Sequence, residues 1–293
     1  MMLKVVHKHT VTFRLNGHLN IHQCFMIEIF QNIREIYDFT APCGELMPYI
    51  EFFSESSAEK CELYFDRGHA SVTMFESWTP TFYINLTGGY VIDVGGKHHN
   101  IGNGKDILIL RNGLVTRHNQ PGDRIFTVKF YPGGLEAVLG LNQVSMGDRV
   151  VSLNRILPQT LLTMLKGAVS FIDRITIMEK FLLTAMRGKV ASDYYSRIVL
   201  AAIGEYTTTD MQLNTSKIAE RLFISSKSIN RYFNRVVGVA PKSYFSVLRA
   251  RTALTAMVGN RNDFKPWIYG YYDPAHFYKD VFRFTGRKIS EVL

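Results

Sequence analysis

A short run in the last third of the chain carries side chains that can read nucleic-acid bases. Residues 226–235 hold these hydrogen-bonding and basic side chains: Ser226, Lys227, Asn230, Arg231 and Arg235. Arginine pairs through two donors with the major-groove edge of guanine, and asparagine pairs in the same bidentate way with adenine. We therefore expect Asn230 and Arg231 to select base pairs, with Lys227 beside them. Arg235 is expected to contact phosphate or to pack.

These side chains need a helix that buries its opposite face. Ile229 and Phe233 are four residues apart, which is the spacing of one apolar stripe on a helix. Ser225 or Ser226 can cap the start of this helix, because a serine oxygen accepts from the unpaired amides of the first turn. Gly238 suits its end, because glycine adopts the left-handed conformation at little cost. The sequence thus predicts a recognition helix that starts near residue 226.

A second, shorter helix is predicted just before the first. Ile218, Ala219 and Leu222 form its apolar face, and a tight turn separates the two helices. A helix with cationic and amide side chains, held by a short partner helix, fits the DNA major groove as a helix-turn-helix. The same spacing fits an ordinary helical pair with a solvated face, so spacing alone leaves both interpretations open.

The distribution of charge also separates the last third of the chain from the rest. The formal net charge is +9, of which residues 201–293 hold +7 and residues 1–200 hold +2. A basic segment joined to a nearly neutral one indicates a module that binds a polyanion. A membrane surface is the rival polyanion, but no amphipathic helix rich in Lys or Arg supports it. Double-stranded DNA is the expected partner, and no membrane contact is expected.

Length and composition place the chain among globular proteins with two domains. It has 293 residues, of which 46% are hydrophobic. The three cysteines, Cys24, Cys43 and Cys61, have neither metal-ligand nor redox spacing, which indicates reduced thiols. The N-terminal residues lack the apolar run of a signal peptide, and no stretch approaches the roughly 18 apolar residues of a membrane span. These features predict a cytoplasmic protein.

Residues 1–25 are expected to form a peripheral extension. They carry four histidines, His7, His9, His18 and His22, at spacings that suit a metal on a strand or on a helix. No acidic ligand accompanies them, so we interpret them as surface residues and expect no metal site.

The segment from residue 47 to residue 140 has the pattern of β-strands. Runs rich in Val, Ile, Phe, Tyr and Thr alternate with Gly, Asn, Asp and Pro, and Gly95-Gly96 is one predicted turn. Many short strands at this spacing predict a β-barrel or a sandwich, whose interior can hold a small ligand. We assign residues 26–150 to a β-rich regulatory domain.

Catalytic motifs are missing from this β-rich segment. No nucleophile elbow, phosphate-binding loop or zinc-binding HExxH sequence is present. His98 and His99 are adjacent, so on a strand they face opposite sides, and no further ligand is spaced to join them. We therefore predict a non-enzyme without catalytic residues, metal ligands or a cofactor. The alternative is a ligand- or metal-binding β-barrel enzyme that carries a basic helical tail.

Residues 151–203 are predicted to be a helical linker. Their apolar positions follow one helix face, in the order Leu157, Leu161, Leu162, Leu165, Val169 and Ile172. Such a face either packs against the β-rich domain or forms the interface of a homodimer, which palindromic or tandem DNA sites favour. The sequence does not decide between these two roles.

Residues 213–286 resemble the DNA-binding domain of the AraC/XylS family of bacterial transcription regulators, in which one long helix joins two helix-turn-helix units. The likeness lies in three places, Ile218-Ala219 to Gly238, Pro241 to Ala253, and Gly270-Tyr271 to Gly286. It implies a protein of α+β class with an all-α DNA-binding domain, here residues 204–293. It also implies RNA polymerase as a partner.

The second of these units departs from the family pattern. Lys265-Pro266-Trp267 occupies the positions where the first helix of the second unit should begin, so we expect a short helix that begins at Pro266. By the family pattern the reader positions of the second unit are Pro274, Ala275, Tyr278 and Lys279. Arginines expected to contact phosphate or to pack are Arg249, Arg251 and Arg283. Because Pro274 and Ala275 cannot donate from a side chain, the second unit should read less sequence and more shape or methyl groups.

A weaker likeness links the β-rich segment to an AraC-associated N-terminal domain with a cupin-like barrel. It rests on Arg67-Gly68-His69-Ala70, on FYPGGL at Phe130 to Leu135, and on Met146 to Val150. It implies a regulatory domain that responds to a small-molecule effector of unidentified chemistry. Together the two likenesses imply a sequence-specific, effector-responsive transcription regulator.

Overall fold

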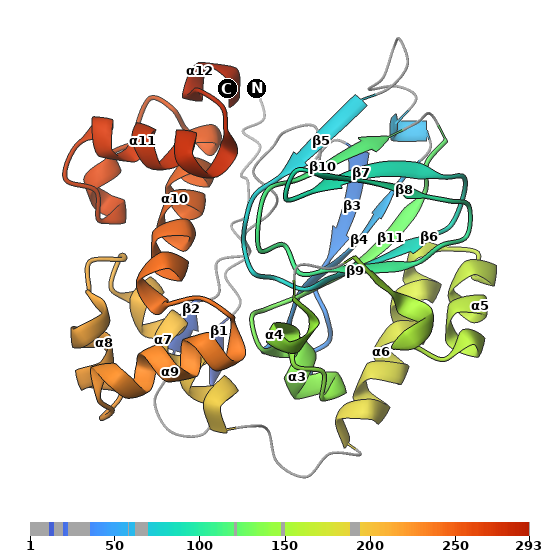
Figure 1. Ribbon diagram of the computed structural model, residues 1–293, viewed down its shortest axis with the longest axis horizontal. Helices are drawn as coiled ribbons and strands as arrows, with labels where there is room; N and C mark the ends of the chain where they lie inside the picture. Colours follow the sequence, from blue (N-terminus) through green and yellow to red (C-terminus); the bar gives the residue numbers. More distant parts are fainter. Residues whose placement is uncertain are drawn as a thin grey trace, which may run out of the picture.

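The computed structural model describes residues 12–14, 20–22, 36–57, 59–61, 70–119, 122–147, 150–187 and 194–292. Within these residues the chain forms two modules that lie side by side (Figure 1). The first, called the β-sandwich here, spans strands β3 to β12 and helices α3 to α6. The second, the helical module, spans α7 to α12. This is the α+β architecture that the sequence predicted.

The larger sheet of the β-sandwich has six antiparallel strands in the order β12-β9-β6-β11-β4-β3. The strands are β3 (Tyr37–Thr40), β4 (Ile50–Ser56), β6 (Thr81–Asn85), β9 (Ile107–Ile109), β11 (Ile125–Phe130) and β12 (Val151–Ser152). Every residue of β4, β6 and β11 is buried. These strands are therefore covered on both faces, although each also buries polar residues.

The smaller sheet has four antiparallel strands in the order β5-β10-β7-β8. The strands are β5 (Ala70–Met74), β7 (Tyr90–Val94), β8 (Lys97–Ile101) and β10 (Val115–Asn119). Burial alternates residue by residue along β7 and β10, so one face packs and the other meets water. Gly95 and Gly96 join β7 to β8 with φ of 56° and 77°, the positive values that a two-residue hairpin requires.

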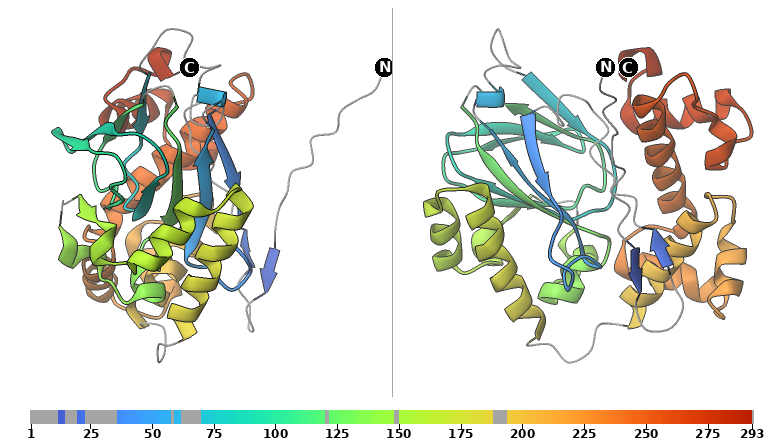
Figure 2. Two further views of the ribbon diagram at one scale, coloured as in Figure 1. Left: turned by 90° about the vertical axis from the view of Figure 1, so that its right-hand side faces the viewer. Right: turned by 180° about the vertical axis from the view of Figure 1, so that it is seen from behind.

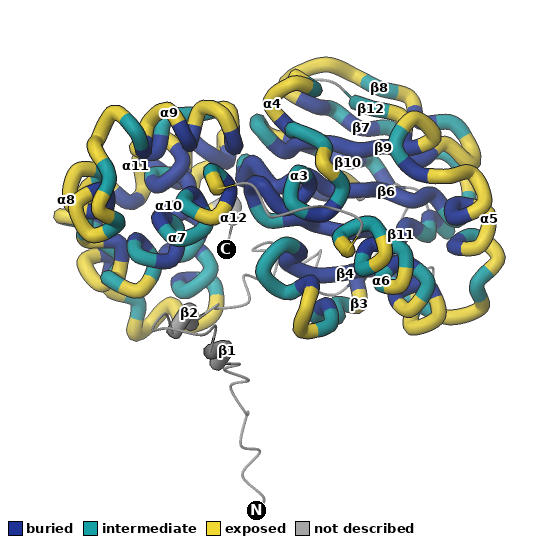
Figure 3. The backbone as a smooth tube through the Cα atoms, turned by 90° about the horizontal axis from the view of Figure 1, so that it is seen from below, coloured by how far each residue is buried: buried dark blue, intermediate teal, exposed yellow. Residues whose placement is uncertain are grey.

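Two apolar layers hold the β-sandwich together. One layer, which includes Val72, Ile92 and Ile109, lies between the two sheets. The other packs the outer face of the larger sheet, through residues such as Phe126, against three helices. These are α3 (Gly134–Leu139), α5 (Gln159–Gly167) and α6 (Phe171–Arg187). Figure 3 shows buried residues running along the strands of both sheets.

The strands form two facing sheets, and within the described residues they do not close into a single barrel. Two short elements complete the β-sandwich, α4 (Gln143–Met146) and the 3₁₀ turn η1 (Leu153–Arg155). Helices α5 and α6 lie on the side of the sandwich that faces away from the helical module (Figure 2).

One part of the predicted linker face is wrong. Leu161, Leu162 and Leu165 are buried against the β-sandwich, but Val169 is 90% exposed and Ile172 is 60% exposed. The reason is that α5 ends at Gly167 and α6 begins at Phe171, so the helical period does not continue between them.

The helical module contains two short helical pairs joined by one long helix. Its elements are α7 (Tyr194–Thr208), α8 (Thr215–Arg221), α9 (Ser226–Val236), α10 (Pro241–Gly259), η2 (Pro266–Tyr269), α11 (Pro274–Thr285) and α12 (Ile289–Val292). The predicted boundary at residue 203 falls inside α7, whose Val199 and Ala202 belong to the core of this module. The division of the chain at residues 25, 150 and 203 stays a prediction.

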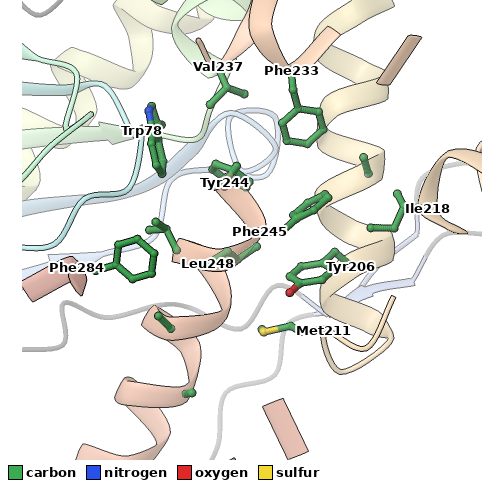
Figure 4. Packing of buried hydrophobic residues seen from close by; sticks show 14 of the residues in the cluster. Trp78, Tyr206, Met211, Ile218, Phe233, Val237, Tyr244, Phe245, Leu248 and Phe284 are labelled. Carbon is green, nitrogen blue, oxygen red and sulfur yellow. The ribbon is translucent and has the colours of Figure 1, made fainter. Parts of the chain in front are cut away.

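Aromatic side chains dominate the core of the helical module (Figure 4). Phe245 of α10 stacks on Tyr206 of α7 at 4.3 Å between ring centroids and meets Phe233 of α9 edge-on at 5.3 Å. Each such ring contributes roughly 1.5–3 kcal/mol by leaving water. Helix α10 is thus the element around which the other helices of the module pack.

The β-sandwich also contributes to this core. Phe75 and Trp78, from the loop after β5, are buried with the helical residues. The ring centroid of Phe75 lies 6.1 Å from that of Phe284. The ring centroid of Trp78 lies 6.0 Å from that of Tyr244 (Figure 4). The two modules therefore share one apolar cluster.

Two strands are described within the predicted peripheral extension. β1 (Thr12–Arg14) pairs antiparallel with β2 (Asn20–His22), and the pair lies beside α7 (Figure 1). His7, His9 and His18 lie outside the described residues. Among the residues that the structure describes, no helix is long and apolar enough to cross a membrane.

Candidate nucleic-acid interface

The first helix-turn-helix unit consists of α8, a short turn and α9. Asn214 caps α8 by accepting from the Lys217 amide at 3.0 Å, and Ser225 caps α9 by accepting from the Ser228 amide at 3.0 Å. The cap is therefore Ser225 and not Ser226. Between the helices Phe223 adopts φ of 54° while its side chain is 96% exposed.

The sequence of α9 gives it one buried and one exposed face. Ile229, Tyr232, Phe233 and Val236 are buried. Four of the predicted contact residues are exposed on the other face: Ser226, Lys227, Asn230 and Arg231. Sequence reasoning missed Asn234, which is exposed one turn after Asn230 and could have been found from that spacing.

The amides and the guanidinium of this face are held by nearby groups. Asn230 donates to the Ser226 carbonyl at 2.8 Å, and Asn234 donates to the Asn230 carbonyl at 2.8 Å. The Arg231 guanidinium lies over the Tyr232 ring, 5.2 Å from its centroid. These contacts hold the side chains on one face of α9, which suits reading in a groove.

Arg235 lies at the edge of this face and is turned toward the β-sandwich. Its guanidinium lies 4.6 Å from the centroid of the Tyr195 ring and 3.8 Å from the Glu136 carboxylate. Arg235 thus approaches an acidic group of the other module.

The second unit consists of η2, a turn and α11. As predicted from Pro266, its first helix begins there and is only four residues long. Gly270 ends η2 in the left-handed conformation, and Asp273 caps α11 by accepting from the His276 amide at 2.7 Å. Tyr278, Lys279 and Arg283, the contact residues predicted for this unit, are all exposed.

The two units share one layout, offset by 48 positions. Ser225 and Asp273 are the caps, and Gly238 and Gly286 follow the ends of the helices. In the buried stripes Ile229 matches Phe277, Tyr232 matches Asp280, Phe233 matches Val281, and Val236 matches Phe284. Both glycines have positive φ, 93° and 68°. Helices α9 and α11 therefore present equivalent faces to solvent.

Two arginines of α10 serve packing. Arg249 binds Asp280 at 3.1 Å and lies over Tyr271 at 4.4 Å, which ties α10 to the second unit. Arg251 is 3% exposed and binds Glu51 of β4 at 3.3 Å. Packing was one of the two roles expected for each, and the burial of Arg251 excludes a phosphate contact in this arrangement.

Glu76 connects the β-sandwich electrostatically to α11. Burial raises the pKa of its carboxyl group to about 7, and the nearby Arg283 guanidinium lowers it only in part. Arg235 and Arg283 hold equivalent places on α9 and α11, and each has a glutamate of the β-sandwich beside it, Glu136 and Glu76.

The interior of the β-sandwich holds a small cavity of about 30 Å³. Its polar lining includes Arg111, Arg117, Lys129 and Tyr83. Burial lowers the pKa of the Arg117 guanidinium to about 10, while the charge of Asp123 opposes that shift. A cavity of this size admits about one water molecule or small ion.

A second cavity, of about 110 Å³, lies where the two modules meet. Trp78, Asn112 and Gln143 line it from the β-sandwich, and Val237 and Gly238 line it from the end of α9. Gln143 also donates to the Val237 carbonyl at 3.1 Å. A molecule in this cavity would contact both modules.

Sequence reasoning was wrong about the surroundings of His98. Strand pairing places it opposite Asp93, whose two carboxylate oxygens accept from His98 Nδ1 at 2.8 Å and from His118 Nε2 at 2.7 Å. These hydrogen bonds lower the pKa of Asp93. Nevertheless, the described residues contain no group of three or more His, Cys, Asp or Glu arranged to hold a metal ion.

Comparison with known proteins gives matches to solved structures only. Neither a protein-family model nor a curated protein sequence matches the chain. ToxT from Vibrio cholerae O395 is similar at 9% identity and a TM-score of 0.46, over 76% of this chain and 95% of that chain. An apo ToxT variant from strain SCE256 is similar at 10% identity and a TM-score of 0.46, over 77% and 93%. The AraC-like transcriptional activator CuxR is similar at 13% identity and a TM-score of 0.33, over 82% and 93%.

Proposed function

We propose that this chain is a sequence-specific DNA-binding transcription regulator of the AraC type. The observation that carries the proposal is the pair of helix-turn-helix units with equivalent caps, cores and outward faces 48 positions apart. Two equivalent helices on one module suit two segments of major groove on one face of DNA. The net charge of +7 on residues 201–293 favours a polyanionic partner.

In this proposal the first unit supplies most of the base reading. Asn230 and Arg231 pair with adenine and guanine edges, and Ser226 and Lys227 contact the backbone or neighbouring bases. For Asn230 to pair with a base, its amide must exchange the Ser226 carbonyl for the base edge. In the second unit Lys279 and Arg283 contact phosphate.

The β-sandwich is proposed to respond to a small-molecule effector. The cavity between the modules supports this role best, because its lining comes from both the β-sandwich and the end of α9. The cavity inside the sandwich suits a small anion, since Arg111, Arg117 and Lys129 line it. RNA polymerase and a second copy of the chain complete the proposed partners, and the proposed location is the cytoplasm.

A salt titration of the full-length protein on random duplex DNA tests the proposal. Counterion release predicts that log K falls with log salt by about 0.9 for each phosphate contact. On a selected binding site, Arg231→Ala should cost about 1–3 kcal/mol at one base pair and relax specificity there.

Arg155→Ala is the matched control, because Arg155 is an exposed arginine of the β-sandwich. It should leave both the salt slope and the affinity unchanged. The absence of salt-dependent DNA binding would reject the proposal and favour the alternative, an enzyme with a basic helical tail.

A further inference from the structure

The equivalence of α9 and α11 allows their outward faces to be compared position by position. At three positions a polar side chain on α9 is replaced by an apolar or aromatic one on α11: Lys227 by Ala275, Asn230 by Tyr278, and Asn234 by Phe282. Two positions stay basic, with Arg231 matched by Lys279 and Arg235 by Arg283, and Ser226 is matched by Pro274. The outward face of α11 has thus lost the amides of α9 and one of its three basic residues, and it keeps two basic residues.

These apolar side chains are exposed. Tyr278 is 44% exposed and Phe282 is 54% exposed, and Ala275 is also at the surface. The spacing 275, 278, 282 is that of one stripe along a helix, and the buried stripe of α11 occupies its opposite face. The stripe therefore lies where α9 carries its own base-reading residues.

Chemistry limits what such a stripe can recognise on DNA. Neither Ala275 nor Phe282 can form a hydrogen bond through its side chain. The 5-methyl group of thymine is the apolar group that a base presents in the major groove, and small apolar side chains and phenylalanine recognise it by contact. Lys279 and Arg283 each follow a stripe residue by one position, so they lie along one side of the stripe and can hold phosphates there.

We propose that α11 reads thymine methyl groups through Ala275, Tyr278 and Phe282. This inference rests on the proposed function and assigns a base chemistry to its second unit. The partner that the surroundings favour is DNA, because the exposed basic residues Lys279 and Arg283 lie along one side of the stripe, and Arg287 and Lys288 follow the end of α11. An apolar protein surface would not match that charge.

Deoxyuridine provides a direct test, because it pairs with adenine as thymidine does and lacks only the methyl group. Duplexes that bind the full-length protein are first selected from a random pool. The segment beneath α9 is then assigned by the base preference that changes in Arg231→Ala, and the segment beneath α11 by footprinting, as the protected segment one helical turn away. Each thymidine is replaced singly by deoxyuridine, and the dissociation constant is measured at fixed salt.

The expected result is a loss of about four-fold for each contacted methyl group in the segment beneath α11, the value for one methyl group kept from water. That loss should disappear in Phe282→Ala or Tyr278→Ala. In the segment beneath α9, replacing thymidine by deoxyuridine should leave the dissociation constant unchanged. Asn234→Ala, at the position equivalent to Phe282, is the matched control and should leave every deoxyuridine effect unchanged.

A second selection with Phe282→Asn tests the assignment independently of affinity. Asparagine at this position restores the amide that α9 carries at Asn234, so the preferred base should change from thymine toward adenine. An unchanged preference would count against the inference.

Three further outcomes would overturn it. Deoxyuridine could be tolerated throughout the α11 segment, or its effect could persist in both alanine variants. Phe282→Ala could instead leave DNA affinity unchanged and alter the mass measured by light scattering, which would identify the stripe as a protein contact. If the protein selects no duplex and shows no salt dependence, the proposed function itself fails and this inference falls with it.

Discussion

Glu51 of the β-sandwich and Arg251 of the helical module form an ion pair at 3.3 Å in which both residues are almost completely buried. The same carboxylate lies 3.3 Å from the ammonium group of Lys129, which is also buried. One anion is therefore shared by two cations, one from each module. Its removal affects both cations, whereas removal of Arg251 leaves Glu51 with Lys129.

Glu51→Gln should therefore destabilise the protein more than Arg251→Met. We expect a loss of about 3–5 kcal/mol for Glu51→Gln, because two buried cations lose the carboxylate that they share. For Arg251→Met we expect about 1–3 kcal/mol, because the pair with Lys129 survives. Urea unfolding followed by tryptophan fluorescence measures both values. The reverse order would show that the pair with Lys129 contributes little.

The pH dependence of stability should change in Glu76→Gln. The folded pKa of Glu76, about 7, lies above the ordinary value of 4.5. The carboxyl group therefore contributes stability that is fully present below pH 4.5 and is lost as the pH rises through 7. Glu76→Gln should match the parent near pH 4.5 and exceed it by about 1–2 kcal/mol at pH 8. This is less than the full pKa shift would give, because water still screens the partly buried carboxylate.

The measurement is thermal or urea unfolding at several pH values between 4.5 and 8. Glu136→Gln is the matched control, because Glu136 lies beside the equivalent arginine, Arg235. It should leave the slope of stability against pH in this range unchanged. A parallel pH profile for the parent and Glu76→Gln would contradict the prediction.

Gly133→Ala should weaken the contact between the β-sandwich and α9. Gly133 has φ of 81°, and a Cβ atom added there would lie 2.8 Å from Cγ1 of Val236, which is fully buried. Gly286, with φ of 68° and nothing within 4 Å of such an atom, is the matched control, because it shares the left-handed conformation of Gly133. Both substitutions should cost about 1–2 kcal/mol for the left-handed backbone. Only Gly133→Ala should add about 1–3 kcal/mol for overpacking, and equal losses would falsify a tight contact at Val236.

The two DNA-reading units should contribute unequally to affinity. Replacing Asn230 and Arg231 together by alanine removes two bidentate contacts, whereas replacing Tyr278 and Lys279 removes one charge and one apolar or weakly polar contact. The first double variant should lose several-fold more affinity for a selected site than the second. Footprinting should show strong protection of one major-groove segment and weak protection one helical turn away. Equal losses and equal protection would show that both units dock alike.

Features of the helical module that depend on neighbouring residues could be predicted from the sequence. The helix ends at Gly238 and Pro266 were predicted because a start or a stop involves groups within one turn of the chain. The choice between Ser225 and Ser226 as the cap required coordinates, because both residues have the same chemistry.

Features that depend on strand register or on contacts between modules could not be predicted. Glu51 and Arg251 are 200 positions apart, and nothing near either residue indicates the other. The hydrogen bonds of Asp93 with His98 and His118 depend on the register between three strands. Arg235 has the charge and hydrogen-bond donors of a DNA contact, but its position beside Glu136 follows from the docking of α9 on the β-sandwich.

The burial of Phe75 and Trp78 among helical residues has a consequence for the order in which the protein matures. The ribosome makes the loop that carries them well before Tyr244 and Phe284, which cover them in the finished protein. Domains generally fold as they emerge, N-terminal part first. During synthesis the β-sandwich therefore presents two bare aromatic rings until α10 and α11 leave the exit tunnel, and a chaperone that holds nascent apolar surface would bind there in that interval.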